Sequence, residues 1–427
     1  MRFRILLAAM ASLPCVYAVF RLFLMEKKRQ EPLPEEVADV FTKERWNTFV
    51  AYKKELKAPF LLSQLLAYLV DLFVILSPFY AWMERLANGN PYGTVAITAV
   101  VLMAVSFLVG LPVSYYRIFT IETKYGLNHR TKQKFFKDEI TEFVTGTVLN
   151  TALYLLLAFI LLHLPAWTNQ FQIPLYKAVL IMAGITAVIV AFLFLASYIS
   201  WLLLRVQYKF TPLQEGELKQ DILKLLKGSR KKVRRIEVYN ESAKSTSKNA
   251  FVLKLPFFRS IGIADNFLAE NSHRELLAVL AHEAGHLKHK PSFWNILNYC
   301  FLGALFCLLV AALVHGAVLT QWEQALEGIF GLTVCNAVLT FAVISWLTQP
   351  LLFVISAYRN TISRMEEAEA DRNAVKEGYG EELIQTFKQV SSDELVDVNP
   401  PELVEFLEYD HPGMTTRIRQ IHHAMQA

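Results

Sequence analysis

The chain has little charge and little cysteine. Only 19% of its 427 residues are charged, whereas a soluble protein of this length carries about 25%. The four cysteines all stand within apolar runs, where they behave as small hydrophobic residues, so no disulfide framework is expected. Instead, 54% of the residues are hydrophobic, 30 are phenylalanine, and the mean hydropathy is +0.32. This composition excludes a disordered or collagen-like chain, argues against an ordinary soluble enzyme, and predicts a membrane protein.

Seven apolar stretches are long enough to cross about 30 Å of hydrocarbon as helices. We predict membrane spans at residues 5–25, 60–83, 94–118, 143–164, 175–204, 292–315 and 328–356. The fifth and the seventh are longer than a bilayer requires, which is compatible with tilt or with extension beyond it. The expected fold class is therefore mainly α, a polytopic membrane protein with seven transmembrane helices. The lipid bilayer is one of its expected partners.

Lysine and arginine are concentrated in alternate connections between these spans. Eight basic residues lie between the first two spans, five lie in the third connection, and the fifth connection is a basic segment of about 80 residues. The intervening connections hold one basic residue, Arg85. Because basic loops stay in the cytoplasm, we expect the N-terminus outside and the C-terminal 70 residues inside, although Arg2 and Arg4 oppose this orientation. The net charge of +5 is thus a topology signal, and no nucleic-acid partner is expected.

Targeting features favour a multi-pass protein of a bacterial inner membrane. The first span has the basic start and apolar centre of a signal peptide, but the residues before Cys15 lack the small side chains of a lipoprotein cleavage site. We therefore expect an uncleaved first helix. The tail has no Lys-Asp-Glu-Leu or dilysine address, which favours a bacterial inner membrane over an endoplasmic reticulum.

The pattern of spans and polar segments divides the chain into four parts. They are transmembrane helices one to five with their loops (1–204), a cytoplasmic domain (205–291), helices six and seven (292–356), and a cytoplasmic C-terminal region (357–427). The second part reads as a small α+β domain, because short β-rich runs at 235–239, 250–255 and 259–264 follow an amphipathic stretch at 215–226. A capping-box pattern then begins at Ser272 and opens a further helix.

That helix carries the motif His282-Glu283-Ala284-Gly285-His286. Two histidines four residues apart share one helical face, so both can reach a single metal ion. Glu283 is rotated by about 100° from His282, so it stands beside the ion and can take a proton from the water that attacks a carbonyl. The alternative is an ordinary glutamate between two surface histidines, which the predicted capped helix disfavours. The motif predicts one zinc ion per chain.

A catalytic zinc needs a third protein ligand. A predicted helix at about 359–378 carries the acidic residues Glu366, Glu367, Glu369 and Asp371. Glu367 and Asp371 are four residues apart and face the same way, so one can bind the metal while the other accepts the outer N–H of a ligating histidine. Spacing alone does not separate the three glutamates, and a solvated acidic face accounts for two of them.

These motifs resemble a known family. His282-Glu283-x-x-His286 followed by Glu367-x-x-Ala370-Asp371 resembles the gluzincin membrane endopeptidases. With seven spans, two of them between the motifs, the chain resembles the type I CAAX prenyl proteases, which trim prenylated C-termini. Further similar elements are residues 124–128 before 135–138, the run Asn249-Ala250-Phe251, and His411-Pro412 with Arg417 after it.

The resemblance implies roles for the motif residues. Glu367 would be the third zinc ligand, and Asp371 would support a ligating histidine from behind. His411 would be a catalytic residue that stabilises the oxyanion, and Arg417 would brace the acidic helix.

The resemblance also implies how substrate is bound. Asn249 and Ala250 would begin an edge strand that binds substrate through its backbone, although an interior strand is equally compatible with the residues alone. The spans would enclose an aqueous chamber, and the partner would be a peptide or protein substrate, including prenylated ones.

Two other functions share some of these features. A membrane-protein quality-control metalloprotease without prenyl specificity carries both motifs but has fewer spans. A non-catalytic transporter or scaffold with a structural metal is disfavoured by Glu283, because a structural site has no use for a general base. The sequence therefore predicts a zinc-dependent membrane endopeptidase similar to CAAX prenyl proteases.

Overall fold

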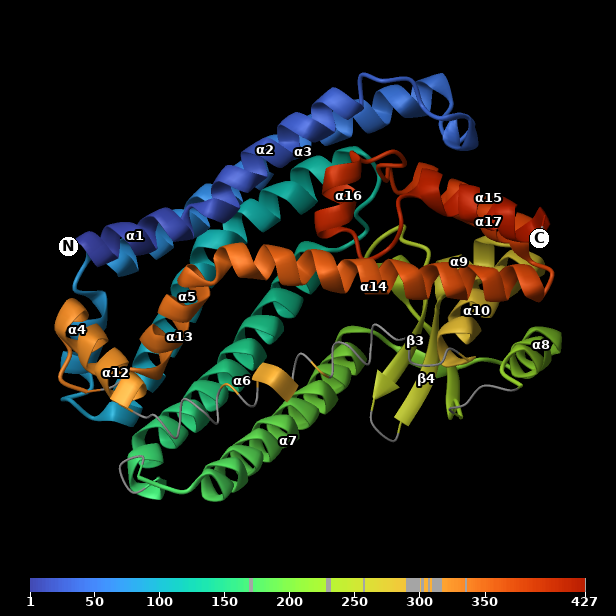
Figure 1. The fold of residues 1–427 in the computed structure, drawn as a ribbon. Helices are drawn as coiled ribbons and strands as arrows, with labels where there is room; N and C mark the ends of the chain where they lie inside the picture. The colour runs from blue at the N-terminus through green and yellow to red at the C-terminus, as the bar shows by residue number, and fades with distance from the viewer. Residues whose placement is uncertain are drawn as a thin grey trace.

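The structure is a computed structural model of the whole chain. It describes residues 1–168, 172–227, 232–255, 258–288, 300, 303–305, 308, 317–334 and 336–426. The predicted sixth span, 292–315, lies almost entirely outside these described residues. Helices dominate the fold, as the sequence predicts (Figure 1).

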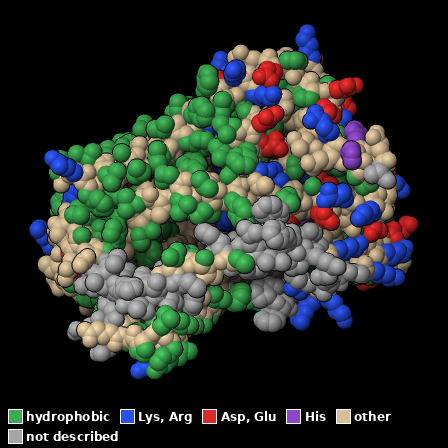
Figure 2. All heavy atoms as spheres, in the orientation of Figure 1, with side chains coloured by type: hydrophobic (Ala, Val, Ile, Leu, Met, Phe, Trp, Pro, Cys, Tyr) green, Lys and Arg blue, Asp and Glu red, His purple; other side chains and the backbone are tan. Residues whose placement is uncertain are grey.

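Five candidate membrane spans make up the N-terminal half of the described chain. They are formed by α1 (Arg2–Ala11) with α2 (Leu13–Lys28), α3 (Lys43–Leu76), α5 (Pro91–Tyr116) with the π-helical turn η2 (Arg117–Glu122), α6 (Lys132–Trp167) and α7 (Leu175–Gln207). Each overlaps one of the first five predicted spans. Their apolar side chains remain largely exposed, and Figure 2 shows hydrophobic side chains covering the left part of the molecule while charged ones gather on the right. This surface is suited to hydrocarbon rather than water.

Two predicted spans differ from the helices that form. The stretch 60–83 is broken, because α3 ends at Leu76 and the short helix α4 (Phe79–Leu86) follows Ser77 and Pro78. Ser77 is extended, as the residue before a proline prefers to be, and proline has no N–H to continue the helix.

The stretch predicted as the seventh span, 328–356, is not one continuous helix. In its place, α12 (Ala317–Phe330) ends at Gly331, and α13 (Ala337–Leu347) and α14 (Gln349–Lys376) follow at an angle of 71° to each other. The bend falls at Thr348, immediately before the first turn of α14, where Pro350 is tolerated because its missing N–H would have no partner. Together α13 and α14 are a candidate for a sixth, bent span.

A four-stranded sheet lies beyond the membrane helices. Its strands are β1 (Phe210–Pro212), β2 (Arg235–Tyr239), β3 (Ala250–Leu255) and β4 (Phe258–Ala264), in the order β1-β2-β4-β3. β2 and β4 are parallel, and the two outer pairs are antiparallel. β2, β3 and β4 occur where the sequence predicts strands, whereas three-residue β1 is too short to leave a periodic signal. β3 is an edge strand of this sheet.

Short helices surround the sheet. They are α8 (Glu217–Leu225), α9 (Asp265–Glu270), α10 (His273–Lys288), α15 (Gly380–Asp393), α16 (Glu402–Glu408) and α17 (Met414–Gln426), with the 3-10 turns η1 (Glu35–Val37) and η3 (Glu241–Ala243). One hydrophobic core joins the sheet to α10, α15 and α17 through buried residues such as Ile263, Leu280, Leu383 and Ile418. The long α14 runs from the membrane helices into this region and lies beside α10 (Figure 1).

Candidate metal centre

The helix α10 begins as its sequence predicts. The Ser272 backbone N–H donates to Glu275 Oε2 (2.7 Å), and the Glu275 N–H donates to Ser272 Oγ (3.3 Å). These two reciprocal bonds form a capping box, which satisfies N–H groups that a helix start otherwise leaves without partners. The cap fixes the register of the helix, and the buried face that follows carries His282.

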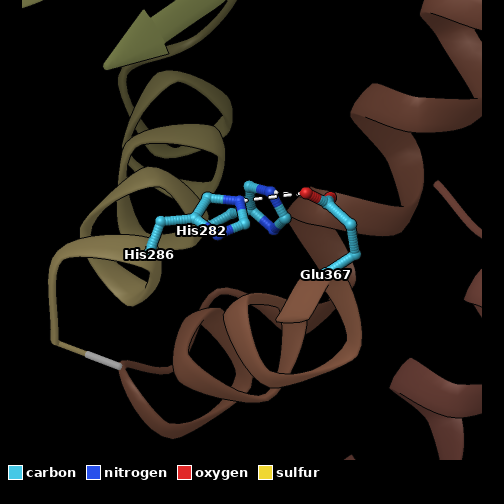
Figure 3. Close-up of side chains that lie close together, drawn as sticks. All are labelled: His282, His286 and Glu367. Carbon is cyan, nitrogen blue, oxygen red and sulfur yellow. Dashed lines mark ion pairs between the residues drawn. The ribbon is translucent and has the colours of Figure 1, made fainter. Parts of the chain in front are cut away.

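Three side chains from two helices meet at one point (Figure 3). His282 and His286 of α10 both point toward the carboxylate of Glu367 on α14. His282 Nε2 lies 3.3 Å from Glu367 Oε2, and His286 Nε2 lies 3.1 Å from Glu367 Oε1. One ligand atom from each residue falls within 4.8 Å of the others. Of the three glutamates that spacing left open, only Glu367 belongs to this cluster.

The cluster has the dimensions of a metal site. Two ligands bound at about 2.0–2.1 Å and at tetrahedral angles lie about 3.3 Å apart, close to the two separations found here. Two imidazoles and one carboxylate are also a donor set that zinc prefers in catalytic sites. His282 and Glu367 are buried, and His286 is partly so, which shields a bound cation from water. The residues therefore fit one divalent ion.

Asp371, which Arg417 holds, fixes the orientation of His282 at Nδ1, the ring nitrogen that does not face Glu367. Asp371 Oδ1 lies 2.8 Å from His282 Nδ1, so a proton on Nδ1 leaves Nε2 as the acceptor facing Glu367. Arg417 donates from Nε to Asp371 Oδ2 (2.7 Å) and from Nη2 to Asp371 Oδ1 (2.9 Å) and Glu367 Oε2 (3.3 Å). All four side chains are buried. A buried guanidinium that meets both carboxylates in this way orients the acidic helix toward α10.

The electrostatic environment favours a cation at His282. Burial acts to lower the pKa of His282, but its hydrogen bonds with Asp371 and Glu367 outweigh burial and raise that pKa. Burial likewise acts to lower the pKa of Arg417, while the charges of Asp371 and Glu367 raise it, so the guanidinium stays charged. The two carboxylates thus stabilise positive charge at His282 and at Arg417.

Replacing Asp371 with asparagine is expected to weaken metal binding by about 10- to 100-fold, because the supporting partner of a ligating histidine loses its charge. The change also removes one anion from buried Arg417. Metal titration of the purified protein against a competing chelator measures the affinity. Asp410→Asn is a matched control, since Asp410 is exposed and its carboxylate pairs, among the described residues, with His411 alone. Equal metal affinity in Asp371→Asn and wild type would contradict the supporting role.

Glu283 stands next to the cluster without belonging to it. It follows His282 on α10 and is half-buried. Among the described residues, none forms a hydrogen bond or ion pair with its carboxylate, in contrast to Glu367 and Asp371. Its oxygens are therefore available to a water or a substrate that enters beside the cluster.

His411 lies at the open side of the cluster. Its Nε2 is 3.5 Å from Glu367 Oε2, and its ring is 56% exposed. Nδ1 is 2.9 Å from Asp410 Oδ1. The ring thus borders both the cluster and solvent, which is where a donor to a substrate oxygen has to stand.

Sequence reasoning missed the polar residues that assemble these helices. Arg364 donates to the carbonyls of Glu405 (2.9 Å) and Tyr409 (2.6 Å), and holds the segment before His411 against α14. Asn373 donates to the Ala281 carbonyl, 2.7 Å away, and ties α14 to α10 next to His282. A polar face on α14 is visible in the sequence, but nothing there identifies which carbonyls it meets.

Asn249 and Ala250 lie at the start of β3, on the edge of the sheet. The Asn249 carbonyl accepts a hydrogen bond from the Ala264 N–H (2.9 Å), and within the described part of the chain β3 pairs with β4 alone. Asn249 is exposed, Ala250 is buried, and α10 packs near β3. The outer backbone groups of β3 therefore form an edge that an extended peptide can join.

The connection between α5 and α6 anchors the loop before β3. Asn128 forms a bridge with Ser245, and the His129 N–H donates to the Lys244 carbonyl (3.0 Å). The Lys244 ammonium lies 3.1 Å from Asp138 Oδ2, and both side chains are only 5% exposed. Residues of the similar elements 124–128 and 135–138 thus hold the loop that leads into the edge strand.

Gly285 lets α10 approach α14 closely. A Cβ at this position would lie 2.8 Å from Ala370 Cα and 3.1 Å from Asn373 Cβ, both nearer than side-chain atoms normally come. The two helices that carry the cluster therefore touch through backbone at the turn between His282 and His286.

We expect Gly285→Ala to lower the free energy of unfolding by about 1–3 kcal/mol, because the added methyl group pushes α14 away. Metal affinity is expected to fall with it. Thermal and denaturant unfolding in detergent, with a metal titration, test this. Gly184→Ala in α7 is the control: its Cβ would meet nothing within 4 Å, so stability should be unchanged or raised by up to about 1 kcal/mol. Similar behaviour of the two variants would contradict the close helix contact.

The fold and the cluster together define a class, the membrane-embedded metallopeptidases. Residues 22–203 match a family described as CAAX prenyl protease N-terminal, five membrane helices, and residues 212–425 match peptidase family M48. The chain belongs to peptidase family M48. It is a multi-pass membrane metalloendopeptidase.

Similar proteins extend over most of the chain. A CAAX prenyl protease 1 homolog of Arabidopsis thaliana is 24% identical over 406 residues, which are 91% of this chain and 90% of that protein. CAAX prenyl protease 1 of Saccharomyces cerevisiae is 27% identical over 332 residues, 74% of this chain and 69% of that protein. The crystal structure of S. mikatae Ste24p has a similar fold, with a TM-score of 0.76 at 22% identity and 99% coverage of both chains.

Proposed function

We propose that this protein is a zinc endopeptidase that cleaves prenylated C-terminal segments of membrane-associated proteins. The observation that carries the proposal is the His282–His286–Glu367 cluster with Glu283 free beside it. One zinc ion per chain would be held by these three ligands, since their spacing and donor set fit it. The similarity to CAAX prenyl proteases over most of the chain supports the substrate class.

The chemistry follows from the positions of the side chains. When bound, zinc would polarise the scissile carbonyl and make the attacking water more acidic. Glu283 takes the proton of that water and passes it to the leaving amine. His411 donates a hydrogen bond to the oxygen that becomes negative. Asp371 and Arg417 keep His282 oriented, and the edge of β3 at Asn249 and Ala250 aligns the peptide through backbone hydrogen bonds.

The proposed setting is a chamber inside the membrane. Seven transmembrane helices would enclose it, including one at 292–315 and the bent pair α13–α14. Residues 205–291 and 357–427 would form the cytoplasmic protease parts, with the N-terminus outside. We propose the inner membrane of a bacterium as the location. Cysteines introduced at Asn249 and at Gly89 test the orientation, since an impermeant thiol reagent added to intact cells should label the Gly89 position alone.

Cleavage of matched peptides tests the substrate class. The purified enzyme should cleave a C-terminally prenylated peptide with a kcat/KM at least about tenfold above that of the same peptide without the isoprenoid, which corresponds to more than 1.4 kcal/mol of extra transition-state binding. The Glu283→Gln variant controls for contaminating proteases. Equal cleavage of both peptides would overturn prenyl specificity and favour a quality-control protease. Absence of cleavage of any peptide by metal-loaded enzyme would overturn the endopeptidase function.

A further inference from the structure

A cavity of about 580 Å³ is lined by residues of α2, α3 and α5 and by residues of the C-terminal region. Three helix segments meet there: the C-terminal end of α2, the N-terminal half of α3 and the C-terminal end of α5. They meet because the first span ends, the second begins and the third ends on the same side of the membrane. Its cationic lining residues are Arg21, Arg29, Lys53, Lys57 and Arg117. All five stand within eight residues of a predicted span boundary. The cavity is therefore at the level where membrane meets water.

Four of these five cations are already paired. The pairs are Arg21–Glu408, Arg29–Asp397, Lys57–Glu26 and Arg117–Glu122. Lys53 differs, since among the described residues no carboxylate lies within ion-pair distance of its ammonium. Its Nζ instead stands 5.6 Å from the ring centre of Phe49 and 5.3 Å from that of Tyr52. A half-buried ammonium without an anion is unfavourable, so the cavity has a place for a negative group.

The other end of the cavity is apolar. Leu56, Pro59 and Phe60 follow Lys53 along α3, and Val113 and Gly110 line the facing side of α5. A Cβ on Gly110 would meet nothing within 4 Å, so open space continues along α5 there. Phe60 and Val113 lie inside the predicted spans, whereas Lys53 lies outside them. Apart from Arg21, whose guanidinium lies over the Phe60 ring, the cavity thus becomes apolar from Lys53 toward Phe60 and Val113.

We propose that this cavity binds an anionic phospholipid, with the head-group phosphate at Lys53 and an acyl chain along Phe60 and Val113. Basic pockets between transmembrane helices bind phospholipid head groups through such an arrangement. The apolar end favours a lipid over free phosphate, because an inorganic anion would leave that surface without a partner. Asp397 and Tyr409 close the cavity from the C-terminal region, so a bound lipid would join that region to α2 and α3.

Lipid binding by the full-length protein in detergent tests the proposal. The probes are phosphatidylglycerol, phosphatidylcholine and inorganic phosphate, and the readouts are the Tm and lipid retention in native mass spectrometry. Phosphatidylglycerol should be retained and should raise the Tm more than the other two. Lys53→Gln should weaken its binding by about tenfold, the value of one charge-assisted hydrogen bond. Lys54→Gln is the matched control, because Lys54 is exposed on the same helix and does not line the cavity.

Three results would overturn the proposal. They are an equal Tm shift with inorganic phosphate, an equal shift with phosphatidylcholine, and equal losses in the Lys53 and Lys54 variants. A photoreactive phosphatidylglycerol provides a test that needs no variant. Its labels on wild-type protein should fall within residues 52–63 and 110–117, and labels confined to other segments would place the lipid elsewhere.

Discussion

Replacement of Glu283 by glutamine is expected to lower kcat by about 10²- to 10⁴-fold, the range that a general base contributes, while one metal ion per chain stays bound. Glutamine has the shape of glutamate but cannot accept the proton. Because Glu283 has no hydrogen-bond partner among the described residues, the substitution disrupts no contact there. Turnover of a prenylated peptide and elemental analysis of the same preparation measure both expected results.

A nearby glutamate provides the control for that experiment. Glu369 is exposed on α14 and pairs with Arg372. Glu369→Gln should keep kcat within about twofold of wild type, as surface substitutions generally do. Wild-type turnover in Glu283→Gln would show that Glu283 is not the base. Loss of metal in the same variant would instead show that it acts as a ligand.

Replacement of Glu367 by alanine is expected to remove the metal. The cluster then keeps only two histidine ligands, and the loss of affinity should exceed the roughly 10- to 100-fold effect of losing a supporting partner. His282, His286 and Arg417 also lose the anion that they share. Elemental analysis after dialysis should find far less than one ion per chain, and peptide cleavage should disappear in parallel.

Glu366 and Glu369, the other two glutamates near Glu367 on α14, test whether loss of metal is specific to Glu367. Glu366→Ala and Glu369→Ala should both retain stoichiometric metal, because neither belongs to the His282–His286–Glu367 cluster. The Tm of each variant, measured in chelator, shows whether its fold survives without metal. If the Glu367→Ala protein kept its metal and the Glu366→Ala protein lost it, Glu366 would be the ligand instead of Glu367.

Local patterns in the sequence predicted much of the fold. The capping box at Ser272 and Glu275 is confirmed by both of its hydrogen bonds. The strands β2 and β3 have the predicted bounds, since short runs of apolar residues that include β-branched and aromatic ones, separated by turn residues, are a local signal. Helices α15 and α16 were missed, although Leu383, Ile384 and Phe387 give α15 an apolar face.

The bend between α13 and α14 shows the limit of hydropathy. An apolar run of suitable length predicted one span at 328–356, because hydropathy does not show where a helix bends. A proline such as Pro350 allows either a kink or the start of a new helix. The packing of α14 against α10 decides in favour of a new helix, which turns away from α13 and carries Glu367 to the histidines.

The sequence by itself determined the class of this protein, because membrane spans and the His-Glu-x-x-His motif are patterns of near neighbours. It placed both histidines on one face of one helix, where 3.6 residues per turn leave no choice. It could not choose among Glu366, Glu367 and Glu369, since that choice depends on how α14 is rotated about its axis. Close contact at Gly285 and the bonds of buried Arg417 set this rotation. Gly285 and Ala370 are 85 positions apart, and the Arg417 bonds reach residues 46 and 50 positions away. Only the tertiary structure therefore decided which carboxylate completes the site.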